Sequence, residues 1–432
     1  MFETMNDREV VIIEGCRTPF LRSGTGYQDL MAYQLGATAI KGLFQRSTVK
    51  PKQVDRVYMG TVVHNVVTSN VARESALIAG IPSKAPATTL SQACVSANAA
   101  IAAGVDAIRL NHADVVVAGG VDCVSDIPIT FRKKMRKKLF GARSIKSPME
   151  GLKFLFSLRP ADFKPDIPDI AEYTTGVVMG VDCDNSAAKY EIAREDQDHY
   201  AVRSHQMAAK AEEDGLLGKE IQPVDLPPKM KTIDKDNGIR GNSSYEKLKK
   251  LRPAFDRKNG TLTAGNSSFL TDGASAVLLM SRSKAEELGL KYKAIVRDYV
   301  FTGRDPMDEL LLGPAYAISI LLNKTGLKLE DIDVFEIHEA FAAQVLYNLK
   351  LLDSEEFAKN NLGFDEKAGK IPEEKMNLWG GSLALGHPFG ATGGRITTTA
   401  ANRLNYENGR YAILAACAAG GHGHAMLLER PN

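Results

Sequence analysis

The chain lacks a long apolar segment: none of its hydrophobic runs approaches the ~18 uncharged residues of a membrane-spanning helix. It also lacks an excess of charge of either sign. Lysine and arginine number 54 against 52 aspartates and glutamates, and a net charge of +2 carries no signature of a polyanion-binding protein. We therefore expect neither a membrane-spanning protein nor one whose partner is nucleic acid.

Cysteine is scarce, with five in 432 residues, and their odd number shows no paired spacing. This pattern argues against a disulfide framework and for a reducing compartment. The first seven residues carry acidic side chains and lack an apolar core, so they predict neither a secretory nor a transit signal. We accordingly expect a cytoplasmic protein.

Short β-rich runs alternate with longer helical patterns along most of the chain, which is typical of an α/β protein. The runs at 115–117 and 413–414 are continuously apolar, which indicates strands covered by helices on both faces. The length of 432 residues favours two to three domains.

A weak internal repeat indicates two similar halves. Segment 52–60 resembles segment 329–337, and Cys94 with its following helix and strand parallels His387 with its own helix and strand. A repeat this long predicts a duplicated domain and not a solenoid.

The predicted domain boundaries follow from this repeat. Residues 1–126 and 254–283 form the N-terminal half, and residues 284–432 form the C-terminal half. Residues 127–253 break the pattern with basic, proline-containing and amphipathic stretches, so they are predicted to be an inserted loop domain.

The first candidate for chemistry is Cys94, which precedes Ser96, the predicted cap of an alanine-rich helix. A thiol at a helix N-terminus meets unpaired N–H groups, which stabilise the thiolate and make it a good nucleophile. A small buried core residue is the alternative interpretation.

His387 lies in a glycine-rich loop, and Pro388 restricts its backbone to extended values. A base beside a cysteine is what nucleophilic catalysis requires. The alternatives are a phosphate-cradling loop or a histidine in an ordinary turn; the loop lacks the ending of a Walker motif.

Cys417 ends an apolar strand, and the small residues after it leave room for backbone N–H groups that bind an oxyanion. His422 and His424 follow closely, but no third ligand is near in sequence, so we predict no metal. His338 stands at another probable strand end, where it serves either as an oxyanion donor, directly or through water, or as a structural histidine.

Four segments together carry a family resemblance: the Cys94 segment, His338-Glu339-Ala340-Phe341, the Gly-His-Pro box at 386–388, and Cys-x-x-Gly-Gly at 417–421. Their types and order resemble the thiolase family, and the similarity covers nearly the whole chain. Within that family, histidine in place of asparagine at position 338 makes the chain similar to the thiolase subunits of trifunctional fatty-acid oxidation complexes.

This resemblance implies a layered α-β-α-β-α core of two duplicated halves with an inserted loop domain. It also implies an acyltransferase, a 3-ketoacyl-CoA thiolase of fatty-acid β-oxidation, which works by a ping-pong mechanism through an acyl-cysteine. The alternatives are a biosynthetic acetoacetyl-CoA thiolase and a catalytically silent CoA-binding subunit.

Residue roles follow from the same resemblance. Cys94 is the implied nucleophile, His387 the general base and Cys417 the general acid and base. His338 is implied to hold the water of one oxyanion hole, and the backbone N–H of Ala419 belongs to a second hole.

The resemblance assigns Arg240 and Ser268 to CoA, a co-substrate, and implies no permanently bound cofactor. It also implies a homodimeric core and a hydratase/3-hydroxyacyl-CoA dehydrogenase subunit as partner. The basic and amphipathic segment 131–158 is expected to contact either an anionic membrane or that partner.

Overall fold

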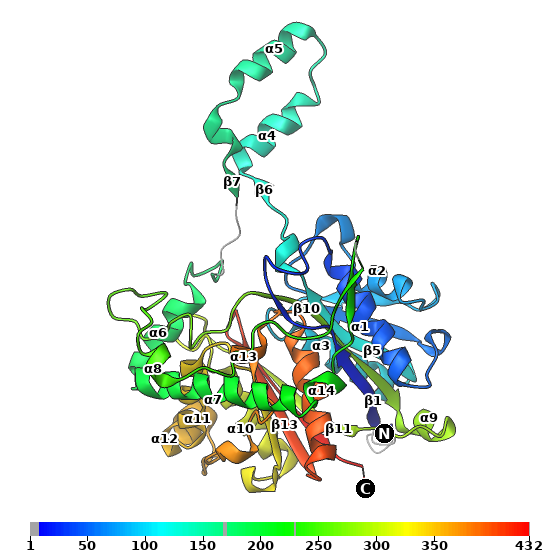
Figure 1. Cartoon of the computed structure of the whole chain (residues 1–432), viewed down its shortest axis with the longest axis vertical. Coiled ribbons are helices and arrows are strands. Elements are labelled where there is room, and N and C mark those ends of the chain that lie inside the picture. Colours follow the sequence, from blue (N-terminus) through cyan, green and yellow to red (C-terminus); the bar gives the residue numbers. More distant parts are fainter. Residues whose placement is uncertain (1–7, 167–170, 229, 432) are drawn as a thin grey trace. The chain divides into compact units, whose positions relative to one another are not determined.

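The structure, a computed structural model, describes residues 8–166, 171–228 and 230–431 (Figure 1). The N-terminal residues 1–7, from which the absence of a targeting signal was predicted, lie outside the described residues. The chain divides into two compact units. The larger contains the residues up to Asp126 and those from Glu172 onward, and the smaller is Ile127–Ala171.

The larger unit is built on one large sheet. Its strands are β1 (Val10–Arg17), β2 (Leu21–Arg22), β3 (Arg56–Gly60), β4 (Ala87–Leu90), β5 (Val115–Asp122), β10 (Thr271–Ser281), β11 (Ala294–Gly303), β12 (Val334–Ile337), β13 (Tyr411–Ala418) and β14 (His422–Glu429). Within the described ranges these ten strands follow the order β12-β13-β14-β11-β1-β10-β5-β3-β4, and β2 pairs with β10.

The two ends of this sheet repeat one pairing scheme, as expected for a duplicated domain. In the N-terminal half β3 runs parallel to β5, which is antiparallel to β10, which is antiparallel to β1. In the C-terminal half β12, β13, β14 and β11 repeat that order and those directions. The repeat segments 52–60 and 329–337 contain the equivalent strands β3 and β12.

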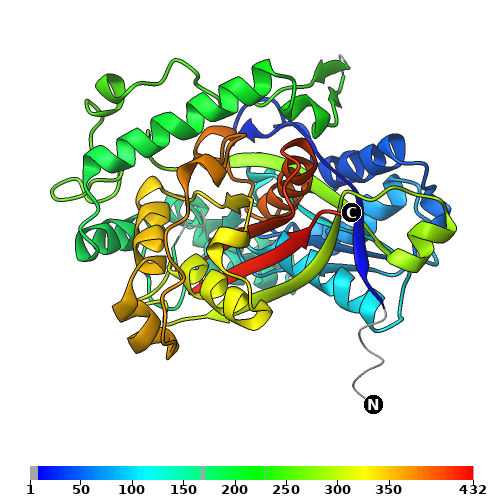
Figure 2. The same ribbon diagram turned by 90° about the horizontal axis from the view of Figure 1, so that it is seen from below.

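The halves join through antiparallel pairing of β1 with β11. Figure 2 shows β14 in red, β11 in yellow-green and β1 in blue lying side by side along this junction.

The main helices of the larger unit are α1 (Ala32–Arg46), α2 (Val71–Ile78), α3 (Ser96–Arg109), α6 (Met179–Lys189), α7 (Arg194–Glu213), α10 (Gly313–Thr325), α11 (Ala342–Leu352), α13 (Ser382–Leu385) and α14 (Thr392–Tyr406). Three hydrophobic clusters show which sheet faces they cover. Side chains of α1 and α2 pack on the outer face of the N-terminal half, and those of α10 and α11 pack on the outer face of the C-terminal half.

Helices α3 and α14 fill the layer between the two halves, because a third cluster joins their apolar side chains to inward-facing residues of strands from both halves. The predicted α-β-α-β-α core is thereby confirmed. The strands at 115–117 and 413–414 are buried along their length, as their continuous apolar pattern predicts.

The first turns of α3 and α14 lie directly against each other. A β-carbon on Gly393, the second residue of α14, would stand 2.2 Å from Oδ1 of Asn98, the third residue of α3. Only glycine permits this approach, which brings the N-terminal ends of the two helices together. The loops that enter these helices carry His387 and Cys94.

The smaller unit is a helical hairpin. Strands β6 (Thr130–Phe131) and β7 (Pro165–Asp166) pair at its base, and helices α4 (Lys133–Ala142) and α5 (Pro148–Ser157) form its arms. Within the described part of this unit only Met135 and Asp162 are buried, and the carboxylate of Asp162 accepts a 2.6 Å hydrogen bond from Lys138.

The predicted inserted domain covers 127–253, but the structure sets apart only 127–171 as its own unit. The rest of that range belongs to the larger unit because α6 and α7 contribute Cys183, Ala187, Tyr200 and Ala201 to the cluster of the C-terminal half. Among the described residues, no helix combines the length and the apolarity that crossing a bilayer requires.

Candidate active site

Cys94 stands on a tight turn at the entrance to α3. Ala93 before it has a φ of 46°, and the hydroxyl of Ser96 closes the turn by donating to the carbonyl of Ala93 (2.6 Å) and accepting from the N–H of Gln92 (2.8 Å). Ser96 is therefore the first residue of the helix and not its cap, as its position had suggested; Val95 is the cap residue. The hydroxyl instead fixes the turn that presents the thiol.

The environment of Cys94 determines the protonation state of its thiol. Burial raises the pKa of its thiol to about 12, although hydrogen bonds from the backbone N–H groups of Ala419 and Cys94 itself lower it, and the charge of Asp122 adds to the rise. The thiol is therefore neutral at rest, and a base must remove its proton when substrate arrives.

The second cysteine reaches the same place from the other half. Cys417 lies near the end of β13, and the chain turns into β14 through Gly420 and Gly421, with φ values of 81° and 70°. This turn brings the N–H of Ala419 to the Cys94 thiol, and charge on Cys94 raises the pKa of Cys417. Burial is the larger cause of that rise, so Cys417 also holds its proton.

The His387 loop is fastened to the N-terminal half of the fold. Asp122 at the end of β5 accepts the N–H groups of Val62 (2.9 Å), Val63 (2.8 Å) and Gly390 (2.5 Å). On the other side, the N–H of His387 donates to the hydroxyl of Thr271 (3.0 Å). One carboxylate thus joins the His387 loop to the loop after β3.

The ring of His387 is buried, and its tautomer follows from its neighbours. Its Nδ1 lies 2.6 Å from the hydroxyl of Thr392, and that hydroxyl donates its own proton to the carbonyl of Pro388 (3.0 Å). With its proton on that carbonyl, Thr392 accepts from His387, and the imidazole hydrogen then stands on Nδ1. Nε2 is buried without a hydrogen-bond partner among the described residues, and burial followed by the charge of Arg395 lowers the pKa of His387 to about 3.

His338 follows β12 directly and lies against His387, with ring centroids 4.0 Å apart. Its backbone N–H donates to the carbonyl of Ala415 on β13, and its Nδ1 lies 2.9 Å from the hydroxyl of Ser382. Its Nε2, like that of His387, is buried and has no partner in the described part of the chain. Burial, His387 and Arg395 hold the pKa of His338 well below its usual range.

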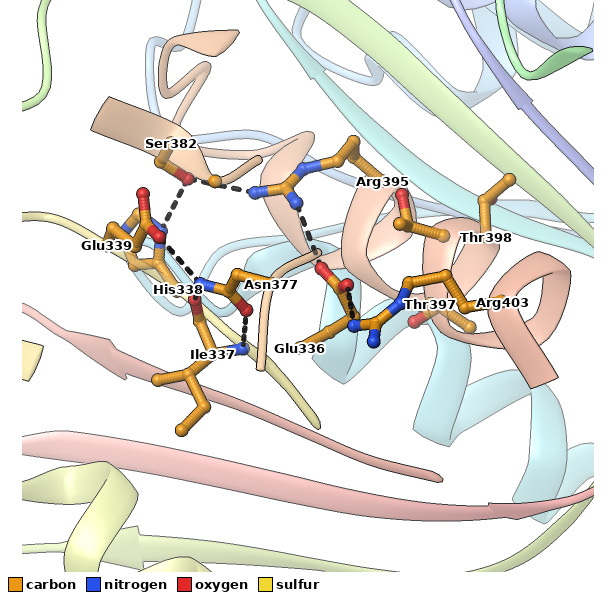
Figure 3. A network of polar contacts seen from close by, with 12 residues as sticks. Glu336, Ile337, His338, Glu339, Asn377, Ser382, Arg395, Thr397, Thr398 and Arg403 are labelled. Carbon is orange, nitrogen blue, oxygen red and sulfur yellow. Dashed lines mark hydrogen bonds and ion pairs between the residues drawn. The ribbon is translucent and has the colours of Figure 1, made fainter. Parts of the chain in front are cut away.

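A buried polar network supports His338 from behind (Figure 3). Arg395 donates to Ser382 (3.0 Å) and pairs with Glu336, which also pairs with Arg403 at 2.8 Å. All four side chains are fully buried. Burial raises the pKa of Glu336 to about 7, against the lowering effect of the two arginines.

Glu339, the neighbour of His338, is held in a second set of hydrogen bonds. Its carboxylate accepts from Tyr200 (2.9 Å), Ser204 (2.7 Å) and Asn377 (2.7 Å), and Asn377 also bonds to the backbone of Ile337 (Figure 3). The bonds to Tyr200 and Ser204 fasten the loop to α7.

The candidate CoA residues lie on the segments around this centre. The N–H of Ser268 donates to the carbonyl of Ala340, and Leu270 bridges to His387, so the segment borders both histidine loops. Arg240 is exposed, and its charge lowers the pKa of Arg22 after burial. Arg22 itself lies 3.9 Å above the ring of Phe269, so two cations stand near Ser268.

His424 is separate from this centre in its contacts. It is buried on β14, its ring packs on Phe301 with centroids 4.4 Å apart, and its Nδ1 donates to the carbonyl of Val300. Among the described residues no cluster of histidine, cysteine or carboxylate side chains is arranged to hold a metal ion.

The structure therefore brings Cys94 and Cys417 together with the N–H of Ala419, and it places His387 against His338. Asp122 links the two groups, because its charge raises the pKa of Cys94 and its carboxylate holds Gly390 of the His387 loop. Sequence reasoning missed their supports. Ser382, Arg395 and Thr392 lie near or within the glycine-rich segment that was already noted, but residue type alone does not reveal which hydroxyl meets which histidine. Glu172, which accepts the N–H of Gly420, lies far away in sequence and carried no signal.

Two family models match the chain: the thiolase N-terminal domain over residues 10–283 and the thiolase C-terminal domain over residues 290–430. The mitochondrial trifunctional enzyme subunit beta of Homo sapiens is 50% identical over 424 residues, which cover 98% of this chain and 89% of that protein. The 3-ketoacyl-CoA thiolase of Photorhabdus laumondii is 42% identical, over 99% of this chain and 98% of its own.

Solved structures agree with these relatives. The crystal structure of human mitochondrial 3-ketoacyl-CoA thiolase superimposes with a TM-score of 0.84 at 31% identity, covering 98% of this chain and 99% of that one. A structure of human mitochondrial 3-ketoacyl-CoA thiolase in complex with CoA gives a TM-score of 0.83, covering 98% of both chains.

Proposed function

The chain belongs to the thiolase family, and from this membership and its active-site geometry we infer that it is a 3-ketoacyl-CoA thiolase. It is an acyltransferase of fatty-acid oxidation that cleaves 3-ketoacyl-CoA with CoA into acetyl-CoA and a shortened acyl-CoA. The observation that carries the assignment is the meeting of Cys94, the Ala419 N–H and Cys417 from the two halves of the fold.

We propose that the first half-reaction begins when Nε2 of His387 takes the proton of the neutral Cys94 thiol. The thiolate attacks the C3 ketone, and the C2–C3 bond breaks to give an acyl-Cys94 thioester and the enolate of acetyl-CoA. Cys417 then gives its proton to C2 of the enolate. The raised pKa of Cys417 supports this role, because the proton is present when the enolate forms.

Two donor sets stabilise the negative charges in this scheme. The protonated His387 and a water held by His338 face the enolate oxygen, and the N–H groups of Cys94 and Ala419 face the tetrahedral oxyanion. Both N–H groups lower the pKa of the Cys94 thiol, which supports the second assignment. Each set stabilises its transition state by about 3 kcal/mol.

In the second half-reaction the Cys417 thiolate takes the proton of a second CoA, whose sulfur attacks the thioester. The shortened acyl-CoA forms, and Cys94 leaves as a thiolate that regains its proton from His387. We propose that Ser268 contacts the pantetheine arm and that Arg240 lies by the adenine or its phosphates. The nearby cation Arg22 supports an anionic ligand there, because the described residues offer its guanidinium no carboxylate partner.

The function is tested by CoA-dependent loss of 3-ketoacyl-CoA, measured with acetoacetyl-CoA and 3-ketohexadecanoyl-CoA. Turnover that favours the long substrate supports the degradative enzyme, and Cys94→Ala should abolish it while the protein stays folded. Turnover of acetoacetyl-CoA alone would instead indicate the biosynthetic thiolase. If the folded wild-type chain cleaves neither substrate, alone or with a hydratase/dehydrogenase subunit, the chain is a catalytically silent CoA-binding subunit.

We propose that the helical hairpin of the smaller unit docks on an anionic membrane. Large apolar side chains on it are exposed, among them Phe140 at 65% and Phe156 at 82%. Six cations stand in segment 132–138, next to this apolar surface. That combination is typical of interfacial helices, in which cations contact headgroups and apolar side chains enter the acyl boundary.

Sedimentation with vesicles tests this docking. The wild-type chain should bind vesicles rich in phosphatidylserine and not neutral ones, and Phe140→Ser with Phe156→Ser should abolish binding without loss of thiolase activity. If neither the wild type nor the variant binds vesicles, and only the wild type captures a hydratase/dehydrogenase subunit, the docking proposal is wrong and the surface belongs to that partner.

We further propose a homodimeric core and a cytoplasmic location. Equilibrium sedimentation tests the first, since the mass should be twice the 46.9 kDa of the chain. Cell fractionation tests the second, and recovery in an organelle would contradict it.

A further inference from the structure

The hydroxyls of Ser382 and Thr392 each contact Nδ1 of one histidine of the contacting pair. Thr392 also contacts a backbone carbonyl, whereas Ser382 also contacts a guanidinium. We propose that Ser382 and Arg395 are positioning residues that hold His338 in the tautomer with its hydrogen on Nε2, opposite to the tautomer of His387. This inference rests on the proposed thiolase function and adds a residue-level device to it.

The hydrogen bonds around Ser382 carry the argument. The guanidinium of Arg395 lies 3.0 Å from the Ser382 oxygen and can only donate, because it has no acceptor. The Ser382 proton must therefore go elsewhere, and His338 Nδ1, at 2.9 Å, is the acceptor that the described residues offer. With Nδ1 accepting, a neutral ring carries its hydrogen on Nε2.

The opposite arrangement is disfavoured at this site. If Nδ1 of His338 carried the hydrogen, the Ser382 oxygen would accept from both His338 and Arg395, and its own buried proton would have no acceptor. The ring is also neutral, because burial, His387 and Arg395 all lower its pKa. One hydrogen is therefore present, and the network decides which nitrogen holds it.

Arg395 is itself fixed. Its pairing with Glu336 and the pairing of Glu336 with Arg403 place a cation behind His338, in a region that is fully buried (Figure 3). This arrangement gives a role to Arg395, a buried arginine that takes no direct part in the proposed mechanism.

The chemical consequence is that the two neighbouring rings have different roles. His387 presents a lone pair on Nε2, which accepts the Cys94 proton, and His338 presents an N–H on Nε2, which donates toward the enolate oxygen through its water. Loss of the Ser382 hydroxyl removes the preference of His338 for the tautomer with its hydrogen on Nε2. When the hydrogen moves to Nδ1, the lone pair on Nε2 faces the negative charge that forms on the enolate oxygen.

Two reactions separate this role from a structural one. Cleavage of 3-ketoacyl-CoA passes through the enolate, whereas exchange of labelled CoA into a saturated acyl-CoA needs only Cys94, His387 and the thioester oxyanion hole. Ser382→Ala should lower kcat for cleavage about 10- to 100-fold and leave KM and the rate of exchange within about twofold of wild type. Ser319→Ala, at a buried serine of α10, is the matched control and should change neither reaction.

The tautomer is read directly from ¹⁵N spectra of protein labelled at its eight histidines, with His338→Asn to identify the signals of that ring. In the wild type His338 should be protonated at Nε2 and not at Nδ1, with the reverse in His387. Protonation of wild-type His338 at Nδ1 would overturn the inference, as would equal losses of cleavage and exchange in Ser382→Ala. Failure of wild type in both reactions would instead overturn the proposed function.

Discussion

His338 and His387 lie against each other as a tilted pair, with ring centroids 4.0 Å apart and an angle of 42° between their planes. The two histidines occupy different kinds of position in the C-terminal half: His338 follows strand β12, and His387 precedes helix α14. Their contact places two buried, neutral imidazoles beside the N-terminal ends of α3 and α14, where the first cysteine also lies.

Removal of the base should abolish both half-reactions. His387→Gln keeps a polar side chain but offers no basic nitrogen to a Cys94 thiol whose pKa is about 12. We expect kcat to fall by about 10²- to 10⁴-fold, measured by cleavage of 3-ketoacyl-CoA and by exchange of labelled CoA. His199→Gln, at an exposed position on α7, is the control; an active His387→Gln would exclude this histidine as the base.

Cys417 should matter for one half-reaction more than for the other. Cys417→Ala removes the proton donor of the enolate, so cleavage should fall by about 10²-fold or more. The exchange reaction forms no enolate and should stay within about tenfold of wild type. Equal losses in both reactions would show that Cys417 supports Cys94 and does not act as the enolate's acid.

Alkylation of Cys94 by iodoacetamide reports its resting state. Because burial raises the pKa of this thiol to about 12, the alkylation rate of the free enzyme should rise about tenfold per pH unit from neutral to mildly alkaline pH, without a plateau. Mass spectrometry of the peptide that contains Cys94 gives the rate. A plateau near neutral pH would reveal a resting thiolate paired with an imidazolium.

The buried histidines predict a loss of stability in acid. Burial lowers the pKa of His424 from 6.5 to about 3, so below 6.5 the unfolded chain takes up a proton that the folded chain refuses. Stability therefore falls as pH falls, by about 2 kcal/mol for this histidine between pH 6.5 and 5. In urea unfolding, the free energy of unfolding of His424→Phe should fall less between pH 6.5 and 5 than that of the wild type. The control His199→Phe should show the same pH dependence as the wild type.

The Asp122 clamp should support both folding and catalysis. Asp122→Asn replaces one acceptor oxygen by an N–H₂ group that faces the N–H groups of Gly390 or of Val62 and Val63. We expect a destabilisation of about 2–4 kcal/mol by urea unfolding, because buried donors lose their partner. Unchanged stability would mean that the clamp is dispensable.

Much of this arrangement was predictable because it depends on local signals. Continuous apolar runs gave the buried strands β5 and β13, the internal repeat indicated the duplicated halves, and loop position singled out Cys94, Cys417, His338 and His387. Each of these signals lies within a short stretch of sequence.

Other features depend on contacts between distant segments. Residue type alone does not predict these contacts. Examples are the turn closed by Ser96, the hydrogen bond from Gly390 to Asp122 and the contact of Glu172 with Gly420. The pKa of Cys94 likewise depends on the folded surroundings, because burial outweighs the N–H groups that favour a thiolate.

The central claim is that acyl transfer proceeds through a thioester on Cys94. The most direct test incubates the enzyme with 3-ketohexadecanoyl-CoA in the absence of CoA, quenches it in acid and measures peptide masses. We predict a tetradecanoyl group on the peptide that contains Cys94, formed together with an equal amount of acetyl-CoA. Acetyl-CoA release without this modification, or an acyl group on Cys417 in its place, would contradict the account.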